Sequence, residues 1–115
     1  MSSVRPPAVA GTFYPSEPQE LRATIAGFMQ GAPRGADIAR TPKALVVPHA
    51  GYRYSGAVAA SAYACLLPVR ERIRRVVLLG PVHRVAVRGL ALPGVDALAT
   101  PLGTIALDVE AIAAL

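Results

Sequence analysis

The sequence contains two histidines, His49 and His83, and each one follows a short apolar run and a proline. The local sequences are Val47-Pro48-His49 and Gly80-Pro81-Val82-His83. Neutral imidazole nitrogens are ligands for borderline transition metals such as Fe(II), Cu and Zn. Two imidazoles that converge in one crevice would therefore form the start of a metal site. The alternative is that each ring belongs to an ordinary loop histidine that forms local hydrogen bonds.

A catalytic metal site usually has a third protein ligand and an open position for water or substrate. Four other side chains could supply that ligand, namely Cys65, Asp96, Asp108 and Glu110. We expect Cys65 late in a helix, about 15 Å along the axis from the loop that holds His49. An unpaired cysteine at such a position is more typical of a small buried apolar group. The residues alone do not assign the third ligand.

Three side chains that could line a pocket follow His49 closely: Tyr52, Arg53 and Tyr54. A phenol can donate a hydrogen bond to a ligand, and a guanidinium can hold a carboxylate. These residues would then form a pocket for an aromatic or anionic ligand beside the histidines. In the alternative interpretation Tyr54 anchors the start of a helix and Arg53 faces solvent.

Two continuous apolar runs, at residues 44–48 and 76–80, predict strands that are buried on both faces, as in a parallel sheet. Ser55 can cap a helix between them, over about residues 56–67, which Pro68 ends. Strand, helix and strand form a βαβ unit, whose crossover leaves the two strands parallel. Loops that follow neighbouring parallel strands lie at the same edge of the sheet, so this unit would bring the two histidines together.

A separate helix is predicted near the N-terminus, after an extended arm that Phe13 and Tyr14 anchor. Ser16 and Gln19 have the spacing of a capping box, and the helix is expected to close at Gly31. Its apolar face repeats at helical spacing and comprises Leu21, Ile25, Phe28 and Met29.

Further strands are predicted at residues 88–92 and 103–107, and Asp108 can cap a last helix. The predicted fold class is therefore α/β, with a mainly parallel sheet and flanking helices. The last helix reaches Leu115 with no residue that closes its C-terminal turn, and about two turns are too short to be stable alone. We interpret residues 1–115 as a single partial domain whose C-terminal half is absent.

The composition narrows the function classes. With 53% apolar and 17% charged residues, the chain is not intrinsically disordered, and its one cysteine excludes a disulfide framework. No apolar run reaches the roughly 18 residues of a membrane span, and no secretory signal is present, so we expect a cytoplasmic protein. The net charge is +5, but Glu71 interrupts the arginine cluster at residues 70–75 and no aromatic residue interleaves it. We therefore expect no nucleic-acid binding.

Four strings in one order carry a family resemblance. They are Val4-Arg5-Pro6-Pro7-Ala8-Val9-Ala10-Gly11-Thr12-Phe13-Tyr14-Pro15; Val47-Pro48-His49-Ala50-Gly51-Tyr52 with Tyr54-Ser55-Gly56; Leu78-Leu79-Gly80-Pro81 with His83-Arg84-Val85; and Asp96 with Thr100-Pro101-Leu102-Gly103. Together they resemble the Memo family of class III extradiol dioxygenase-like proteins, whose bacterial and archaeal members are named AmmeMemoRadiSam system protein B. The chain departs from the family pattern at Val82, where many members carry a small polar residue that could orient His83.

The resemblance implies that the chain is the N-terminal half of an extradiol-dioxygenase-like α/β fold. It matches His49 and His83 to the family's two metal-ligand histidines and places the third ligand, a cysteine, in the C-terminal half. Fe(II) or Cu is then expected in preference to Zn. Two functions follow from it: a metal-binding protein of redox type with dioxygenase-like chemistry, or a non-enzymatic metal-carrying or interaction module. The system name implies radical-SAM and AMMECR1-domain proteins as partners, and self-association into a homo-oligomer stays open.

Overall fold

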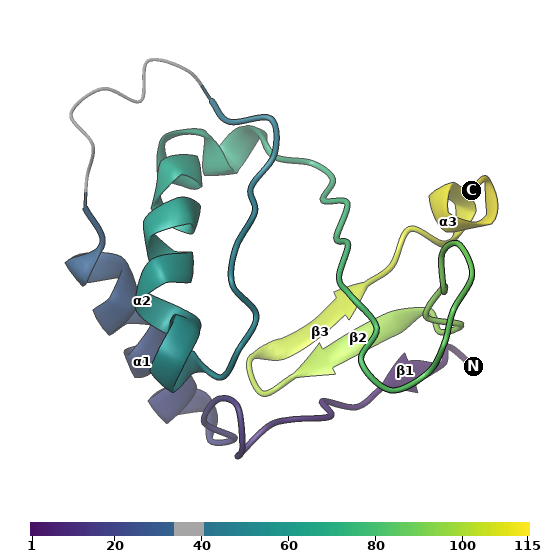
Figure 1. Ribbon diagram of the computed structural model, residues 1–115, viewed down its shortest axis with the longest axis horizontal. Coiled ribbons are helices and arrows are strands. Elements are labelled where there is room, and N and C mark those ends of the chain that lie inside the picture. Colours follow the sequence, from purple (N-terminus) through teal and green to yellow (C-terminus); the bar gives the residue numbers. More distant parts are fainter. Residues whose placement is uncertain (34–40) are drawn as a thin grey trace.

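The computed structural model describes residues 1–33 and 41–115 and contains helices together with one small sheet (Figure 1). The helical part comprises α1 (Pro18–Gly31), α2 (Tyr52–Tyr63) and the 3₁₀ helix η1 (Ala64–Arg72). The sheet comprises β1 (Val4–Arg5), β2 (Ala97–Thr100) and β3 (Gly103–Ala106), and a short helix α3 (Val109–Ala113) follows it. The predicted combination of helices and strands is confirmed. None of the described helices is long and apolar enough to cross a membrane.

Helix α1 begins one residue later than the predicted capping box. The carboxylate of Glu17, rather than the hydroxyl of Ser16, accepts the hydrogen bond of the free Glu20 N–H, at 3.0 Å. Pro18 then takes the first helical position, where its missing N–H costs nothing. The predicted apolar face is confirmed, because Leu21 is buried and its three companions on that face are half-buried.

Helix α2 begins at Tyr52, before the predicted start, so Ser55 lies inside the helix instead of capping it. The Ser55 hydroxyl accepts a hydrogen bond from the Ala50 N–H at 2.9 Å and thereby holds the preceding loop against the helix. Pro68 does not end the helical segment, because it lies within the 3₁₀ helix η1. The fixed φ of proline is compatible with 3₁₀ geometry. The helical segment therefore continues past Pro68 as a 3₁₀ helix.

Helices α1 and α2 pack closely together (Figure 1). Ala32, Ala60 and Ala64 are buried in this contact, and Phe28 and Met29 pack against them. Gly56 permits the close approach, because a Cβ atom at this position would overlap the Phe28 ring.

The sheet has the strand order β1-β2-β3, in which β1 and β2 are parallel and β2 and β3 are antiparallel. Strand β3 confirms the prediction at residues 103–107, and Asp108 caps α3 by accepting a hydrogen bond from the Ala111 N–H at 3.0 Å. The prediction missed β2, which lies between the predicted strands at residues 88–92 and 103–107. A mainly parallel sheet is not confirmed within residues 1–33 and 41–115.

The predicted strands at residues 44–48, 76–80 and 88–92 are not present as strands. These segments have no ladder partner in the described part of the chain, and several of their side chains face solvent. Val46 is 98% exposed and Leu78 is 80% exposed. An apolar run predicts burial, but a strand forms only where a second strand satisfies its backbone groups. The βαβ unit is therefore not formed as predicted.

Candidate metal-binding site

His49 and His83 lie next to each other although their flanking segments form no sheet. The centroids of the two imidazole rings are 5.3 Å apart, and the ring planes are inclined by 40°. Both residues are exposed. The predicted juxtaposition of the two histidines is thus present in the structure. It does not depend on a parallel ladder, because the segments that precede the two histidines form no strands.

Hydrogen bonds fix the backbone on the C-terminal side of His49. The Tyr52 N–H donates to the Phe13 carbonyl at 2.7 Å, which ties the start of α2 to the N-terminal arm. The neighbouring Ala50 N–H donates to Ser55, as described above. His49 therefore projects from a loop that is held at two points, whereas His83 lies in a segment without regular structure.

The separation of the rings fits two imidazoles on one ion. With metal–nitrogen bonds of about 2.1 Å, each ring centroid lies about 3.2 Å from the metal, so a tetrahedral bond angle separates the centroids by about 5.2 Å. A direct contact between two aromatic rings falls in the same range of separations. The distance is thus compatible with shared coordination and with simple ring packing.

No third histidine, cysteine or carboxylate joins this pair among the residues that the structure describes. The four candidates are placed in other contacts or elements. Cys65 is half-buried in η1, where its thiol donates to the Ser61 carbonyl at 3.6 Å. Asp96 accepts from the backbone and hydroxyl of Ser3, Asp108 pairs with Arg75, and Glu110 lies in α3.

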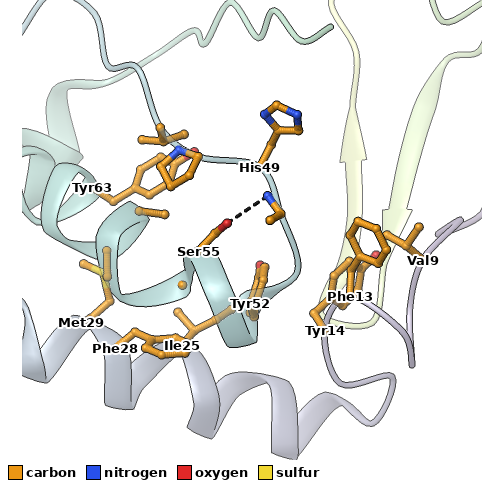
Figure 2. A pocket seen from close by; sticks show the side chains of 16 residues that line it. Val9, Phe13, Tyr14, Ile25, Phe28, Met29, His49, Tyr52, Ser55 and Tyr63 are labelled. Carbon is orange, nitrogen blue, oxygen red and sulfur yellow. Dashed lines mark hydrogen bonds between the residues drawn. The ribbon is translucent and has the colours of Figure 1, made fainter. Parts of the chain in front are cut away.

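Of the three predicted pocket residues, Tyr52 lines a cavity among the described residues. This cavity of about 590 Å³ lies between the N-terminal arm, α1, α2 and the segment that carries His49 (Figure 2). Arg53 and Tyr54 are exposed, and the Arg53 guanidinium lies 5.8 Å from the centre of the Tyr54 ring. The alternative interpretation, in which Arg53 faces solvent, describes that residue better.

Tyr52 is the central aromatic residue of the cavity. Its ring lies 5.5 Å from the ring of Tyr14 and 6.5 Å from that of Phe28, measured between centroids (Figure 2). Burial raises the pKa of the Tyr52 phenol above its ordinary value, and the phenols of Tyr14 and Tyr63 raise it further. Tyr14 and Phe28 also line the cavity, although their sequence patterns indicated only an anchor and a core face.

A family model described as Memo-like protein matches residues 5–115. The chain belongs to the Memo family. Memo relatives from distant organisms are similar to it over most of its length. The MEMO1 family protein of Aquifex aeolicus is 40% identical over 107 residues, and that of Methanopyrus kandleri is 39% identical over 112 residues. Protein MEMO1 of Xenopus tropicalis is 38% identical over 99 residues.

The chain spans about a third to two-fifths of the length of these Memo proteins. The aligned regions cover 93%, 92% and 86% of this chain but only 38%, 39% and 32% of the respective relatives. More than half of each of these three relatives therefore has no counterpart in the aligned residues. The two histidines lie within the region that the family model covers.

Proposed function

We propose that this Memo chain supplies two imidazole ligands, His49 and His83, to a redox-active transition metal, Fe(II) or Cu. The observation that supports the proposal is the 5.3 Å separation of the two ring centroids. An ion bound there would supply one-electron redox chemistry and act as a Lewis acid toward an oxygen ligand. A cytoplasmic location, which we also propose, would maintain the reduced states Fe(II) and Cu(I).

The protein's own contribution is to position the two rings. The loop before α2 holds His49 through the Ala50–Ser55 and Tyr52–Phe13 hydrogen bonds. Exposure of both rings leaves room for further ligands beside the two imidazoles. We propose that a third protein ligand completes the site within an extradiol-dioxygenase-like fold with a mainly parallel sheet.

A non-enzymatic metal carrier is the second candidate. It is favoured by the small ligand set, because within the described part of the chain only two donors come together. Such a site binds an ion weakly and exposes it for transfer to another protein. The proposed recipients are the radical-SAM and AMMECR1-domain proteins that the system name implies.

Both functions require that His49 and His83 bind a metal ion, and metal titration of the chain tests this requirement. We expect Cu(I), measured by competition with a chromophoric chelator, to bind weakly to the native chain. His49→Ala and His83→Ala should each weaken binding by about tenfold or more. Both rings are exposed, so these substitutions should leave the helical circular dichroism unchanged.

Cys65→Ala is the matched control, because its thiol contacts the Ser61 carbonyl rather than the histidines. This substitution should leave the affinity for Cu(I) unchanged. Equal affinity for Cu(I) in the native chain and both histidine variants would refute the assignment of His49 and His83 as ligands. If the site is confirmed, oxygen consumption by the copper-loaded or iron-loaded protein with electron-rich aromatic compounds separates the enzyme from the carrier.

A further inference from the structure

The two histidines are supported unequally by the rest of the chain. Two backbone groups that follow His49 closely have partners, namely the N–H groups of Ala50 and Tyr52. His83 lies in the segment at residues 74–95, whose backbone groups form no hydrogen bond with any other residue that the structure describes. The support of the histidine pair therefore comes from the side of His49.

The N-terminal arm contains a closed turn at residues 9–14, which we call the arm turn. Its first carbonyl, that of Val9, accepts hydrogen bonds from the N–H groups of Thr12 and Phe13, at 3.1 and 2.9 Å. The Thr12 hydroxyl donates to the same carbonyl at 2.9 Å. The last carbonyl of the turn accepts from the Gly11 N–H at 2.7 Å. These hydrogen bonds fix the backbone of the turn, including the Phe13 carbonyl.

Gly11 allows the arm turn to form. Its φ is +83°, in the left-handed region that residues with a Cβ atom rarely adopt. A side chain would find space here, since a Cβ atom would lie 3.6 Å from the Ser16 hydroxyl oxygen. Backbone strain, rather than a steric clash, is therefore the cost of a substitution, and this strain acts on the turn itself.

The arm turn contacts the first residue of α2 in two ways. The Phe13 carbonyl accepts the hydrogen bond of the Tyr52 N–H at 2.7 Å. The rings of Tyr14 and Tyr52 also lie together, with 5.5 Å between their centroids (Figure 2). Since His49 is only three residues before Tyr52, a displaced turn would displace the backbone from which the imidazole projects.

We infer, on the basis of the proposed metal site, that the arm turn positions His49 and that Gly11 is the positioning residue. It acts through the hydrogen bond between the Phe13 carbonyl and the Tyr52 N–H. An imidazole that is held in place before the ion binds loses less conformational freedom on binding. The arm turn thus strengthens metal binding although it contains no histidine, cysteine or carboxylate.

Two substitutions at Tyr52 isolate this hydrogen bond. Tyr52 is the first residue of α2, a position that accepts proline because its N–H has no partner within the helix. Gly51 has φ −54° and ψ 151°, an extended conformation that is compatible with a following proline. Tyr52→Pro therefore removes the ring and the N–H, whereas Tyr52→Ala removes the ring alone. The helical circular dichroism of the two variants should be the same.

Nuclear Overhauser effects between the ring protons of His49 and His83 measure their juxtaposition in the metal-free chain. We expect these effects in the native chain and in Tyr52→Ala, and we expect them to be weak or absent in Tyr52→Pro. Cu(I), measured by competition with a chromophoric chelator, should bind about three- to tenfold more weakly to Tyr52→Pro than to Tyr52→Ala, which corresponds to the loss of one hydrogen bond.

Gly11→Val and Gly94→Val form a second pair with matched backbone strain. Gly94 has φ +66°, lies outside the arm and has no atom within 4 Å of the Cβ position. Valine is unfavourable at positive φ in both places. Only Gly11→Val should weaken the ring-to-ring effects and Cu(I) binding, and it should weaken neither further in a chain that already carries Tyr52→Pro.

Equal ring-to-ring effects and equal Cu(I) affinity within both pairs of variants would overturn the positioning role of the arm turn. A native chain that shows the ring-to-ring effects but binds no Cu(I) would refute the proposed metal site, and the effects in the variants would then decide the positioning role by themselves. Absence of these effects in the native chain would overturn the positioning role, since the two rings would not be held together.

Discussion

At the scale of single residues, Tyr52 connects the arm, the two helices and the cavity. Its N–H donates to the Phe13 carbonyl, and its ring contacts Tyr14 and Phe28. Tyr52 is therefore held by partners from two segments that are distant from it in the sequence, the N-terminal arm and α1. Partial burial of the phenol favours the protonated form, because an ionised phenolate loses hydration there.

This burial predicts a pH dependence of stability. Tyr52 has a raised pKa in the folded chain, so its contribution is fully present below the unfolded pKa of about 10. As the pH rises above that value the unfolded chain releases the proton first, and the contribution is lost as the pH passes through the raised folded pKa. Urea unfolding at a series of alkaline pH values should show a steeper loss of stability for the native chain than for Tyr52→Phe.

Tyr54→Phe is the control for this measurement. Tyr54 is 77% exposed, and removal of its hydroxyl should leave the alkaline loss of stability as it is in the native chain. Identical pH profiles for the native chain and Tyr52→Phe would show that the Tyr52 phenol is not held in an apolar environment.

At the scale of elements, the distance between α1 and α2 depends on one small residue. Gly56 faces the Phe28 ring so closely that no side chain fits between them. Glycine normally weakens a helix interior because its unfolded chain has more conformational freedom. In α2 that cost is offset by the close packing of the two helices, which buries Ala60 and Ala64.

Two glycine substitutions with the same chemistry should therefore have opposite effects. Gly56→Ala should lower the free energy of unfolding by about 1–3 kcal/mol, because its methyl group displaces the Phe28 ring. Gly27→Ala, in α1 with nothing within 4 Å, should raise it by about 0.5–1 kcal/mol. Urea unfolding of both variants measures the difference.

The double variant Gly56→Ala with Phe28→Leu tests the cause. Its destabilisation should be smaller than the sum of the two single effects, since the smaller side chain leaves room for the methyl group. If the effects of the two substitutions on the free energy of unfolding are additive, or if Gly56→Ala stabilises the chain, Gly56 does not pack as closely against the Phe28 ring as the structure shows.

At the scale of the whole molecule, the first residues of the chain are joined to the sheet by a polar contact. Asp96 accepts hydrogen bonds from the Ser3 N–H at 2.6 Å and from its hydroxyl at 3.1 Å. The Ser3 carbonyl in turn accepts from the Asp96 N–H at 2.9 Å. This contact spans 93 positions of the sequence and sets the parallel register of β1 on β2.

Asp96→Ala should lower the free energy of unfolding by about 1 kcal/mol, because it removes two hydrogen bonds at an exposed site. The Ala97 amide, which donates to the Ser3 carbonyl, should exchange faster as β1 detaches. Glu71→Ala is the control, since this exposed carboxylate only approaches Arg70 at 3.8 Å and should change stability little. Unchanged exchange at Ala97 in Asp96→Ala would show that the contact does not hold β1.

Local patterns predicted the helices well and the strands poorly. The apolar face of α1 and the cap at Asp108 follow from interactions within a few residues, and both are present. The start of α2 was misplaced, because Ser55 accepts from a loop N–H instead of capping the helix. The strands at 44–48 and 76–80 were predicted from apolar composition, which contains no information about a pairing partner.

The sequence by itself determined the family, the two histidines and the helical faces, because motif residues and helical periodicity are properties of neighbouring positions. Only the tertiary structure decided that the two imidazole rings lie 5.3 Å apart, that Tyr52 lines the cavity while Arg53 and Tyr54 are exposed, and that β1 pairs with β2. These features depend on contacts between segments tens of residues apart. Such contacts form where they satisfy backbone groups and bury apolar surface, and neither condition can be read from one segment alone.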